Sequence, residues 1–189
     1  NEFSINSNLL LKLIKKCKFS ISNDDTRHYL SGIFLHQTEK DGNFFLTAAA
    51  TDSHRMSISK VAIDSKKNFE PIIIPKKTIY QLSSLLEDNQ GDVKICNIKS
   101  KIKFKFNSSI LVSKLIDGKF PNYIQVVPKN NEKKLEMNLK SFLNSVDRVI
   151  SVSSDRKDGV KFKLSKNSLN LSVNNPNSGD GNELLEVGF

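Results

Sequence analysis

The feature that most limits how this chain can fold is a pattern that occurs three times. An extended segment, an amphipathic helix and several short alternating strands follow one another, with starts near residues 2, 71 and 135. The period is roughly 60 to 70 residues, longer than that of ordinary solenoid repeats. Helices combined with strands that are joined by short turns indicate an α+β fold built from a repeated supersecondary unit.

The alternation of apolar residues places strands after each helix. In the first unit the pattern predicts strands at 19–22, 32–36, 44–50 and 56–63, and in the second at 93–98, 102–106 and 110–114. The third unit resembles the first, with a helix at 139–149 and strands at 160–164, 168–173 and 183–189. We therefore expect a first domain over 1–127, a linker that begins at Pro128, and the opening half of a second domain over 128–189.

Each unit has one helix with a basic side. In the first helix Leu10, Leu13, Ile14 and Cys17 lie at helical spacing, and Asn6 or Ser7 can cap its start. The basic residues on the three helices are Lys12, Lys15, Lys16, Lys76, Lys77, Lys140 and Arg148. A solvated helix face is the usual meaning of such a group, but its recurrence in every unit favours one continuous positive surface that contacts duplex phosphates. No aromatic residues alternate with these cations, which disfavours a site that stacks single-stranded bases.

Composition narrows the environment and the partners. Lys and Arg number 29 against 20 Asp and Glu, a net charge of +9 that suits nucleic acid, an acidic membrane or an acidic protein. Cys17 and Cys96 have no CxxC or CxxH spacing, so we expect no disulfide framework, no metal site, and a reducing, cytoplasmic setting. No segment has the roughly 20 apolar residues that cross a bilayer, so we expect no membrane partner.

One dense polar group could in principle carry catalysis. The loop 51–55, TDSHR, contains Ser, His and Asp, but as immediate neighbours, whereas catalytic triads bring residues together from separate elements. A polar turn capped by Thr51 or Asp52 explains the loop on local chemistry alone. The alternative is a nuclease that uses Asp52 and His54, which lacks a second carboxylate cluster for a metal. We therefore expect a protein without catalytic activity and without a cofactor.

Arginine is scarce, which makes its positions informative. Four arginines occur in the chain, and Arg27 and Arg55 lie in two polar loops. In a chain whose cations are mostly lysine, arginine indicates a use for its planar guanidinium. Together with Leu30, Met56 and Pro121, these loops could form the rim of a small apolar pocket for a short extended peptide.

Five segments together resemble one family. They are DTRHYLSGI (25–33), ATDSHRM (50–56), IPKK (74–77), SKLIDGKFPNY (113–123) and NNPN (174–177). In order and spacing they are similar to the bacterial DNA polymerase III beta subunit, the sliding clamp. The resemblance covers essentially the whole chain. It implies the DNA-clamp fold, with helices toward the hole of a ring and antiparallel sheets outside, and it equates 1–127 with the middle clamp domain and 128–189 with the first half of the third.

The resemblance also implies a pocket that receives short linear motifs. Its residues would be Arg27, Leu30, Thr51, Ser53, His54, Arg55, Met56, Pro121, Gln125 and Val126. Ser53 stands where the family usually has glycine, Met56 where leucine is common, and Gln125 where a basic residue is frequent. Because the family completes this pocket with its extreme C-terminus, we expect weak peptide binding by this chain alone.

The implied function is that of a processivity factor. The partners would be double-stranded DNA, the replicative polymerase subunit, the clamp loader and repair polymerases, with a homodimeric ring in the full-length protein. The helix cations named above would face DNA, with His28 and Tyr29 near the ring face. A general basic nucleic-acid-binding module is the remaining alternative, and it predicts substantial affinity for linear DNA with a steep salt dependence.

Overall fold

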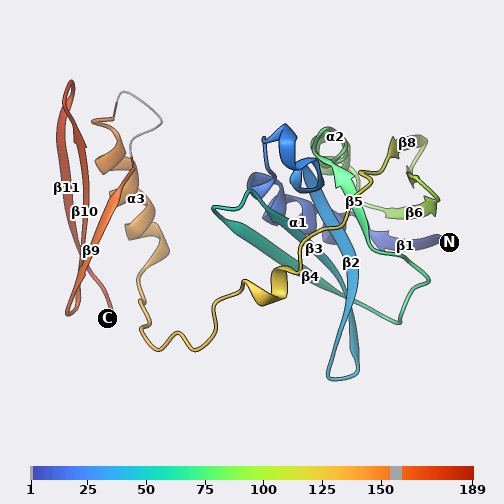
Figure 1. Cartoon of the computed structure of the whole chain (residues 1–189), viewed down its shortest axis with the longest axis horizontal. Helices are drawn as coiled ribbons and strands as arrows, with labels where there is room; N and C mark the ends of the chain where they lie inside the picture. The colour runs from blue at the N-terminus through green and yellow to red at the C-terminus, as the bar shows by residue number, and fades with distance from the viewer. Residues whose placement is uncertain (1, 154–158) are drawn as a thin grey trace. The chain divides into compact units, whose positions relative to one another are not determined.

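The computed structural model describes residues 2–153 and 159–189, which form two compact units, Asn1–Tyr123 and Ile124–Phe189. Figure 1 shows both units. The predicted linker from Pro128 to residue 134 lies within the second unit. The similarity between the first and third repeats includes residues 150–155, ISVSSD, which resemble 19–24, FSISND, and the last two of these lie outside the described ranges.

The first unit contains two repeats of one strand, one helix and three strands, and each predicted helix is confirmed. Helix α1, Ser7–Cys17, begins where the Asn6 side chain accepts a hydrogen bond from the Asn8 N–H at 3.0 Å. Helix α2, Lys76–Glu87, follows Pro75, whose fixed φ suits a helix start. The strands of the two repeats are β1 Glu2–Asn6, β2 Gly32–Lys40, β3 Asn43–Thr51, β4 Met56–Ile63, β5 Ile72–Pro75, β6 Asp92–Ile98, β7 Lys101–Phe106 and β8 Ser109–Lys114.

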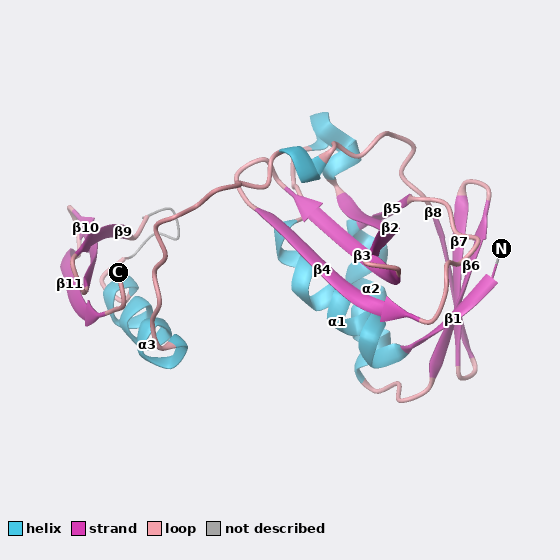
Figure 2. Ribbon diagram, turned by 90° about the horizontal axis from the view of Figure 1, so that it is seen from below, coloured by secondary structure: helices cyan, strands magenta, loops and turns pink. Residues whose placement is uncertain are grey.

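The two repeats exchange their first strands. One sheet has the order β1-β6-β7-β8 and the other β4-β3-β2-β5, and all neighbouring strands are antiparallel. Thus β1 joins the sheet of the second repeat, and β5 joins the sheet of the first. Helices α1 and α2 pack against each other (Figure 2). Their apolar faces, including Leu13 and Leu82, are fully buried in one core with residues of both sheets, such as Leu46 and Phe104.

The predicted strand at 19–22 is wrong. The structure has a short 3-10 helix, η1 Lys18–Ser20, and Ile21 continues in extended backbone outside any sheet. The alternation of apolar and polar residues in 19–22 imitated a strand, but the structure exposes Phe19 and buries Ser20, Ile21 and Ser22. A second 3-10 segment, η2 Asp25–Leu30, then leads into β2.

The outer face of the sheet β1-β6-β7-β8 is lysine-rich. Lys94 lies opposite Lys105, and Lys101 lies opposite Lys114, in antiparallel register. These four lysines are exposed to solvent. The other face of β7 is apolar, with Ile102 and Phe104 fully buried. The strict alternation of β7 therefore separates core from solvent.

The second unit contains helix α3 and a three-stranded sheet. Helix α3, Leu139–Ile150, begins where Asn138 accepts a hydrogen bond from the Ser141 N–H at 3.0 Å. The antiparallel strands are β9 Lys161–Ser165, β10 Ser168–Asn175 and β11 Gly179–Glu186, in the order β11-β10-β9. Val149 of α3 packs in a core with Leu169, Leu171 and Val173. Strand β11 starts four residues before the predicted 183 because it pairs with β10 from the turn onward, Asn175 opposite Gly179.

Candidate functional site

Asp24 organises the first of the two arginine-bearing loops. Its carboxylate accepts hydrogen bonds from the Thr26 hydroxyl at 2.6 Å, the Thr26 N–H at 2.9 Å and Arg27 Nε at 2.8 Å. These bonds, those from Thr26 foremost, lower the pKa of Asp24 to about 2. The loop thus holds the Arg27 guanidinium from its Nε side and leaves the other nitrogens available.

Asp52 organises the second loop in the same way. Its carboxylate accepts hydrogen bonds from the His54 N–H at 3.0 Å, the Arg55 N–H at 2.9 Å and Arg55 Nε at 3.1 Å. Burial raises the pKa of Asp52, but the hydrogen bonds from Arg55 and His54 outweigh it and lower the pKa overall. Thr51 Oγ1 accepts from the Ser53 N–H and donates to the Arg55 carbonyl. Asp52 is therefore occupied in shaping the turn, as the capped-turn interpretation predicts.

The two loops meet through one hydrogen bond. Arg27 Nη1 donates to Ser53 Oγ at 2.6 Å, although the residues lie 26 positions apart in the chain. Arg55 extends over the ring of Phe19, with 5.8 Å between its guanidinium carbon and the ring centroid. His54 and Arg55 are exposed. The predicted proximity of the two arginine loops is therefore observed in the structure.

A buried apolar cluster lies next to the loops. Leu30 is only 3% exposed and packs in a cluster with Ala49, Ile73, Phe120 and Tyr123, against which Met56 also packs. Pro121, next to Phe120, is exposed. Leu30 is therefore part of this buried cluster and not an exposed rim residue. Gln125 and Val126 belong to the second unit, where both are exposed.

Ser53 has a backbone conformation that favours glycine, with φ +75°. Because a Cβ in this left-handed region costs about 1 kcal/mol, we expect Ser53→Gly to be more stable to unfolding than Ser53→Ala by about 1 kcal/mol. Both variants lose the hydroxyl that accepts from Arg27, so their difference isolates the Cβ. Urea denaturation measures it, and equal midpoints would contradict the expected strain.

The basic residues of the first unit lie on both helices. Lys15 of α1 forms an ion pair with Glu87 at 2.9 Å, whereas Lys12, Lys16 and Lys77 form none among the residues that the structure describes. The Lys76 ammonium donates a hydrogen bond to the side-chain oxygen of Asn23. Its Nζ also lies 5.8 Å from the centroid of the Tyr80 ring, and the Nζ of Lys18 lies 5.4 Å from the same centroid. Tyr80 and Lys18 adjoin the predicted basic surface, although neither residue was predicted from the sequence. Lys76 and Tyr80 lie four positions apart on one helix, and this spacing could have indicated that the tyrosine is next to the basic surface.

In the second unit the two predicted cations of α3 differ. Lys140 is exposed. Arg148 forms a two-point ion pair with Glu183 of β11, with Nε to Oε1 at 2.7 Å and Nη2 to Oε2 at 2.9 Å, and it also donates to Ser145. Hydrogen bonding to Glu183 raises the pKa of Arg148. Most of the charge of Arg148 is therefore balanced within the unit.

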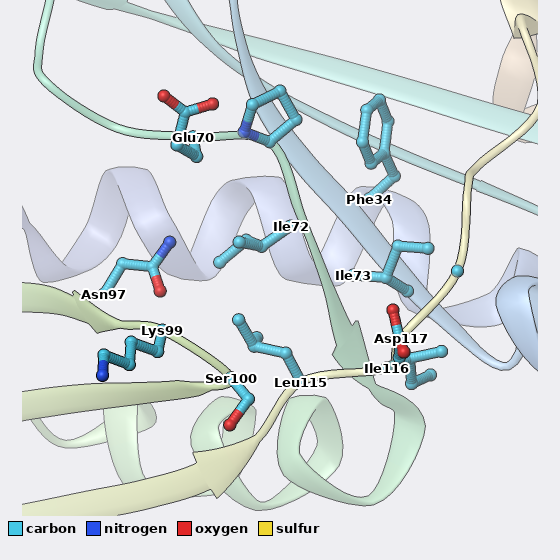
Figure 3. A pocket seen from close by; sticks show the side chains of 12 residues that line it. Phe34, Glu70, Ile72, Ile73, Asn97, Lys99, Ser100, Leu115, Ile116 and Asp117 are labelled. Atoms are coloured by element: carbon cyan, nitrogen blue, oxygen red, sulfur yellow. The ribbon is translucent and has the colours of Figure 1, made fainter.

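His28 and Tyr29 lie against the segment that follows β8. His28 Nε2 is 3.1 Å from the carbonyl oxygen of Asp117, and the two neighbouring rings of His28 and Tyr29 meet edge to face. A Cβ at Gly118 would lie 3.1 Å from the Cβ of Tyr29, so this segment packs closely on η2. The same segment borders a cavity of about 580 Å³ whose apolar wall includes Phe34, Ile73 and Ile116 (Figure 3). Sequence patterns gave no signal for this cavity.

Metal binding and membrane crossing would each require a recognisable structural feature. Among residues 2–153 and 159–189, no group of three or more His, Cys, Asp and Glu side chains is placed to hold a metal ion. Within those same ranges, no helix combines the length and apolar character that crossing a membrane requires.

Comparison with protein families identifies both units. Residues 4–122 match the central domain of the DNA polymerase III beta subunit, and residues 124–189 match its C-terminal domain. The chain belongs to the DNA polymerase III beta subunit family. The resemblance drawn from the five sequence segments is thereby confirmed.

Relatives of this beta subunit chain are named beta sliding clamps. The clamp of Caulobacter vibrioides is 33% identical over 190 residues, which cover 100% of this chain and 51% of the relative. The clamp of Rickettsia bellii is 35% identical over 187 residues, 97% of this chain and 48% of the relative. The chain therefore spans about half the length of the curated relatives it matches.

Solved structures of beta subunits confirm the predicted α+β clamp fold. A Caulobacter crescentus beta sliding clamp matches with a TM-score of 0.95 and 33% identity, covering 100% of this chain and 50% of that one. A Bartonella birtlesii sliding clamp, solved with griselimycin bound, matches with a TM-score of 0.91 and 36% identity, covering 99% and 50%.

Proposed function

We propose that this beta subunit chain is part of a DNA sliding clamp, which encircles duplex DNA and tethers polymerases without doing chemistry of its own. The observation that carries the proposal is the match of both units, over nearly every residue, to consecutive domains of one family. On this proposal the first unit is the middle clamp domain and the second is part of the third. The complete protein would be a homodimeric ring in the bacterial cytoplasm, associated with the nucleoid during replication.

The two arginine loops would bind partner peptides. An apolar floor of Leu30 and Met56, bordered by Arg27 and Arg55, suits a short extended segment that carries apolar anchors and an acidic or polar group. The replicative polymerase subunit, the clamp loader and repair polymerases would supply such segments. The pocket set would also include Thr51, Ser53, His54, Pro121, Gln125 and Val126. Griselimycin, found on the Bartonella clamp, is a candidate ligand for this chain.

The basic helix surface would face the DNA. Exposed lysines attract phosphates without reading bases, which permits sliding because no contact depends on sequence. The set comprises Lys12, Lys15, Lys16, Lys76, Lys77 and Lys140, with Arg148, His28 and Tyr29 at its margins. Tethering then keeps the local concentration of template high for the bound polymerase.

Charge reversal of unpaired lysines tests this assignment. In the complete gene product, we expect Lys12→Glu, Lys16→Glu and Lys77→Glu together to shorten the lifetime of the clamp on nicked circular DNA about tenfold, because phosphate attraction is replaced by repulsion. Extension of a primer on circular single-stranded template, with the cognate loader and polymerase, should give correspondingly shorter products.

The control carries the same change of charge elsewhere. Lys101→Glu, Lys103→Glu and Lys105→Glu lie on one strand of the outer sheet, and we expect this variant to retain nearly full product length. Equal losses of product length for both triple variants would show that net charge, and not the helix surface, determines the effect. A wild-type protein that never extends product length would refute the clamp function. Plasmid nicking with divalent metal that disappears in His54→Ala would support the nuclease alternative.

A further inference from the structure

A layered aromatic stack joins β2 to the segment that carries Pro121. The ring of Phe120 stacks on Phe34, with centroids 4.9 Å apart and planes 6° from parallel. Phe34 stacks in turn on His36, at 4.4 Å and 18°. Tyr123 meets His36 edge to face at 5.6 Å. Two residues of the strand and two of the segment therefore form one unit of packing.

A single polar contact lies within this stack. The Tyr123 hydroxyl is 2.9 Å from His36 Nε2. His36 is 8% exposed, and its Nδ1 has no hydrogen-bond partner among the described residues. Because buried polar groups are costly when unpaired, the hydrogen bond with the Tyr123 hydroxyl stabilises the buried imidazole.

The stack is continuous with the candidate peptide site. Phe120 and Tyr123 share one buried cluster with Leu30, and Met56 packs against that cluster. Pro121 stands between the two aromatic residues, and the Tyr123 N–H donates to the Pro121 carbonyl at 2.7 Å. At its other end the segment is fastened to β5, where the Ile116 N–H donates to the Ile73 carbonyl at 3.0 Å. Figure 3 shows Ile73 and Phe34 beside the chain that carries Ile116 and Asp117.

We propose that His36 is a positioning residue for the partner-peptide site. Through its hydrogen bond with the Tyr123 hydroxyl, it fixes the segment that carries Pro121 in the arrangement that accepts a peptide. His36 itself is buried beneath this segment and does not touch the peptide. The inference rests on the proposed peptide-binding function, and it adds to that function a residue of β2 outside the site itself.

The experiment is a double-mutant cycle on peptide affinity in the complete gene product. The probe is a fluorescein-labelled peptide with a clamp-binding motif of the replicative polymerase, followed by anisotropy at a temperature where all variants are folded. Tyr123→Phe and His36→Phe each keep an aromatic ring and remove the hydrogen bond. We expect each to weaken binding about fivefold, and the double variant to lose no more than either one, because both remove the same interaction.

A rescue variant and a matched control separate positioning from stability. His36→Gln retains a side chain that can bond the Tyr123 hydroxyl, and we expect it to bind peptide within about twofold of wild type. Thr38→Val, two positions along β2, removes the 2.7 Å hydrogen bond between Thr38 and Thr47 and leaves the stack intact. We expect this control to lose stability but not affinity. Exchange of the Tyr123 amide hydrogen should accelerate in Tyr123→Phe and His36→Phe and remain unchanged in Thr38→Val.

The outcomes separate the positioning role of His36 from the peptide-binding function itself. If wild-type protein binds peptide and the two phenylalanine variants bind equally well, or if their losses add, His36 is not a positioning residue and the peptide site stands. If wild-type protein does not bind the peptide at all, the peptide-binding function fails and the inference fails with it.

Discussion

Gly32→Ala is expected to destabilise the first unit by about 3 kcal/mol, because there is no room for a Cβ at this position. A Cβ on Gly32 would lie 2.3 Å from the carbonyl oxygen of Ile74 and 2.9 Å from its carbonyl carbon. Both are backbone atoms of β5, which pairs with β2 at this point. The strands would have to separate, since no side chain can move aside.

The damage should extend to both proposed surfaces. Gly32 follows η2, which carries Arg27 and Leu30, and the Lys76 N–H at the start of α2 donates to the carbonyl of the adjacent Ser31 at 2.9 Å. Urea denaturation followed by circular dichroism measures the loss. Gly91→Ala is the matched control, because the nearest atom to its Cβ would be Asn107 Oδ1 at 4.0 Å. We expect the control to change the free energy of unfolding by less than about 0.5 kcal/mol. Similar losses in the two variants would contradict the steric argument.

The second large effect is an acid-dependent loss of stability that originates at His36. Burial lowers the pKa of His36 from 6.5 to about 4, with a smaller contribution from the charge of Lys60. Between these two pKa values the unfolded chain binds a proton that the folded chain does not. The free energy of unfolding therefore decreases as the pH falls. The stabilisation is therefore complete above about pH 6.5 and is lost as the pH falls toward 4, by about 3 kcal/mol in total.

Urea denaturation of the first unit between pH 7.5 and pH 4 tests this. We expect His36→Gln to remove most of the pH dependence in that interval, because glutamine does not titrate. His54→Gln changes an exposed histidine and should retain the wild-type dependence. Asp24 titrates below this window, since its pKa is lowered to about 2, so its contribution appears only in stronger acid. An unchanged slope in His36→Gln would assign the acid sensitivity to other groups.

Much of the fold could be predicted from the sequence, because its periodicity is strong. The strands at 93–98, 102–106 and 110–114 coincide with β6, β7 and β8 within one residue. Apolar residues alternate strictly with lysines in β7, where Ile102 and Phe104 are fully buried. The helices could be predicted equally well, because their apolar residues recur at helical spacing. The prediction for the segment 19–22 was wrong because an alternating sequence does not show whether a neighbouring strand is present. The segment pairs with no strand, and it buries Ser20 and Ile21 while Phe19 is exposed.

The candidate site was only partly readable. The two arginine loops were visible because arginine is rare in this chain and because the motifs of the family are specific. Asp24 and His36 were not identified as important, since their roles depend on contacts with Arg27 and Tyr123 that no local pattern shows. The ion pair of Arg148 with Glu183, 35 positions away, likewise depends on how α3 packs on β11.

The exchange of first strands between the two repeats has a kinetic meaning. Strand β1 can pair only when β6 is available, and about ninety residues separate Phe3 from Ile95, its partner in register. Neither repeat can complete its own sheet, so a half that opened alone would leave unpaired strand edges in the other half. The first unit should therefore fold slowly for its size and unfold in one cooperative step. The first unit therefore has no independent half that strain could open while the other half stays folded.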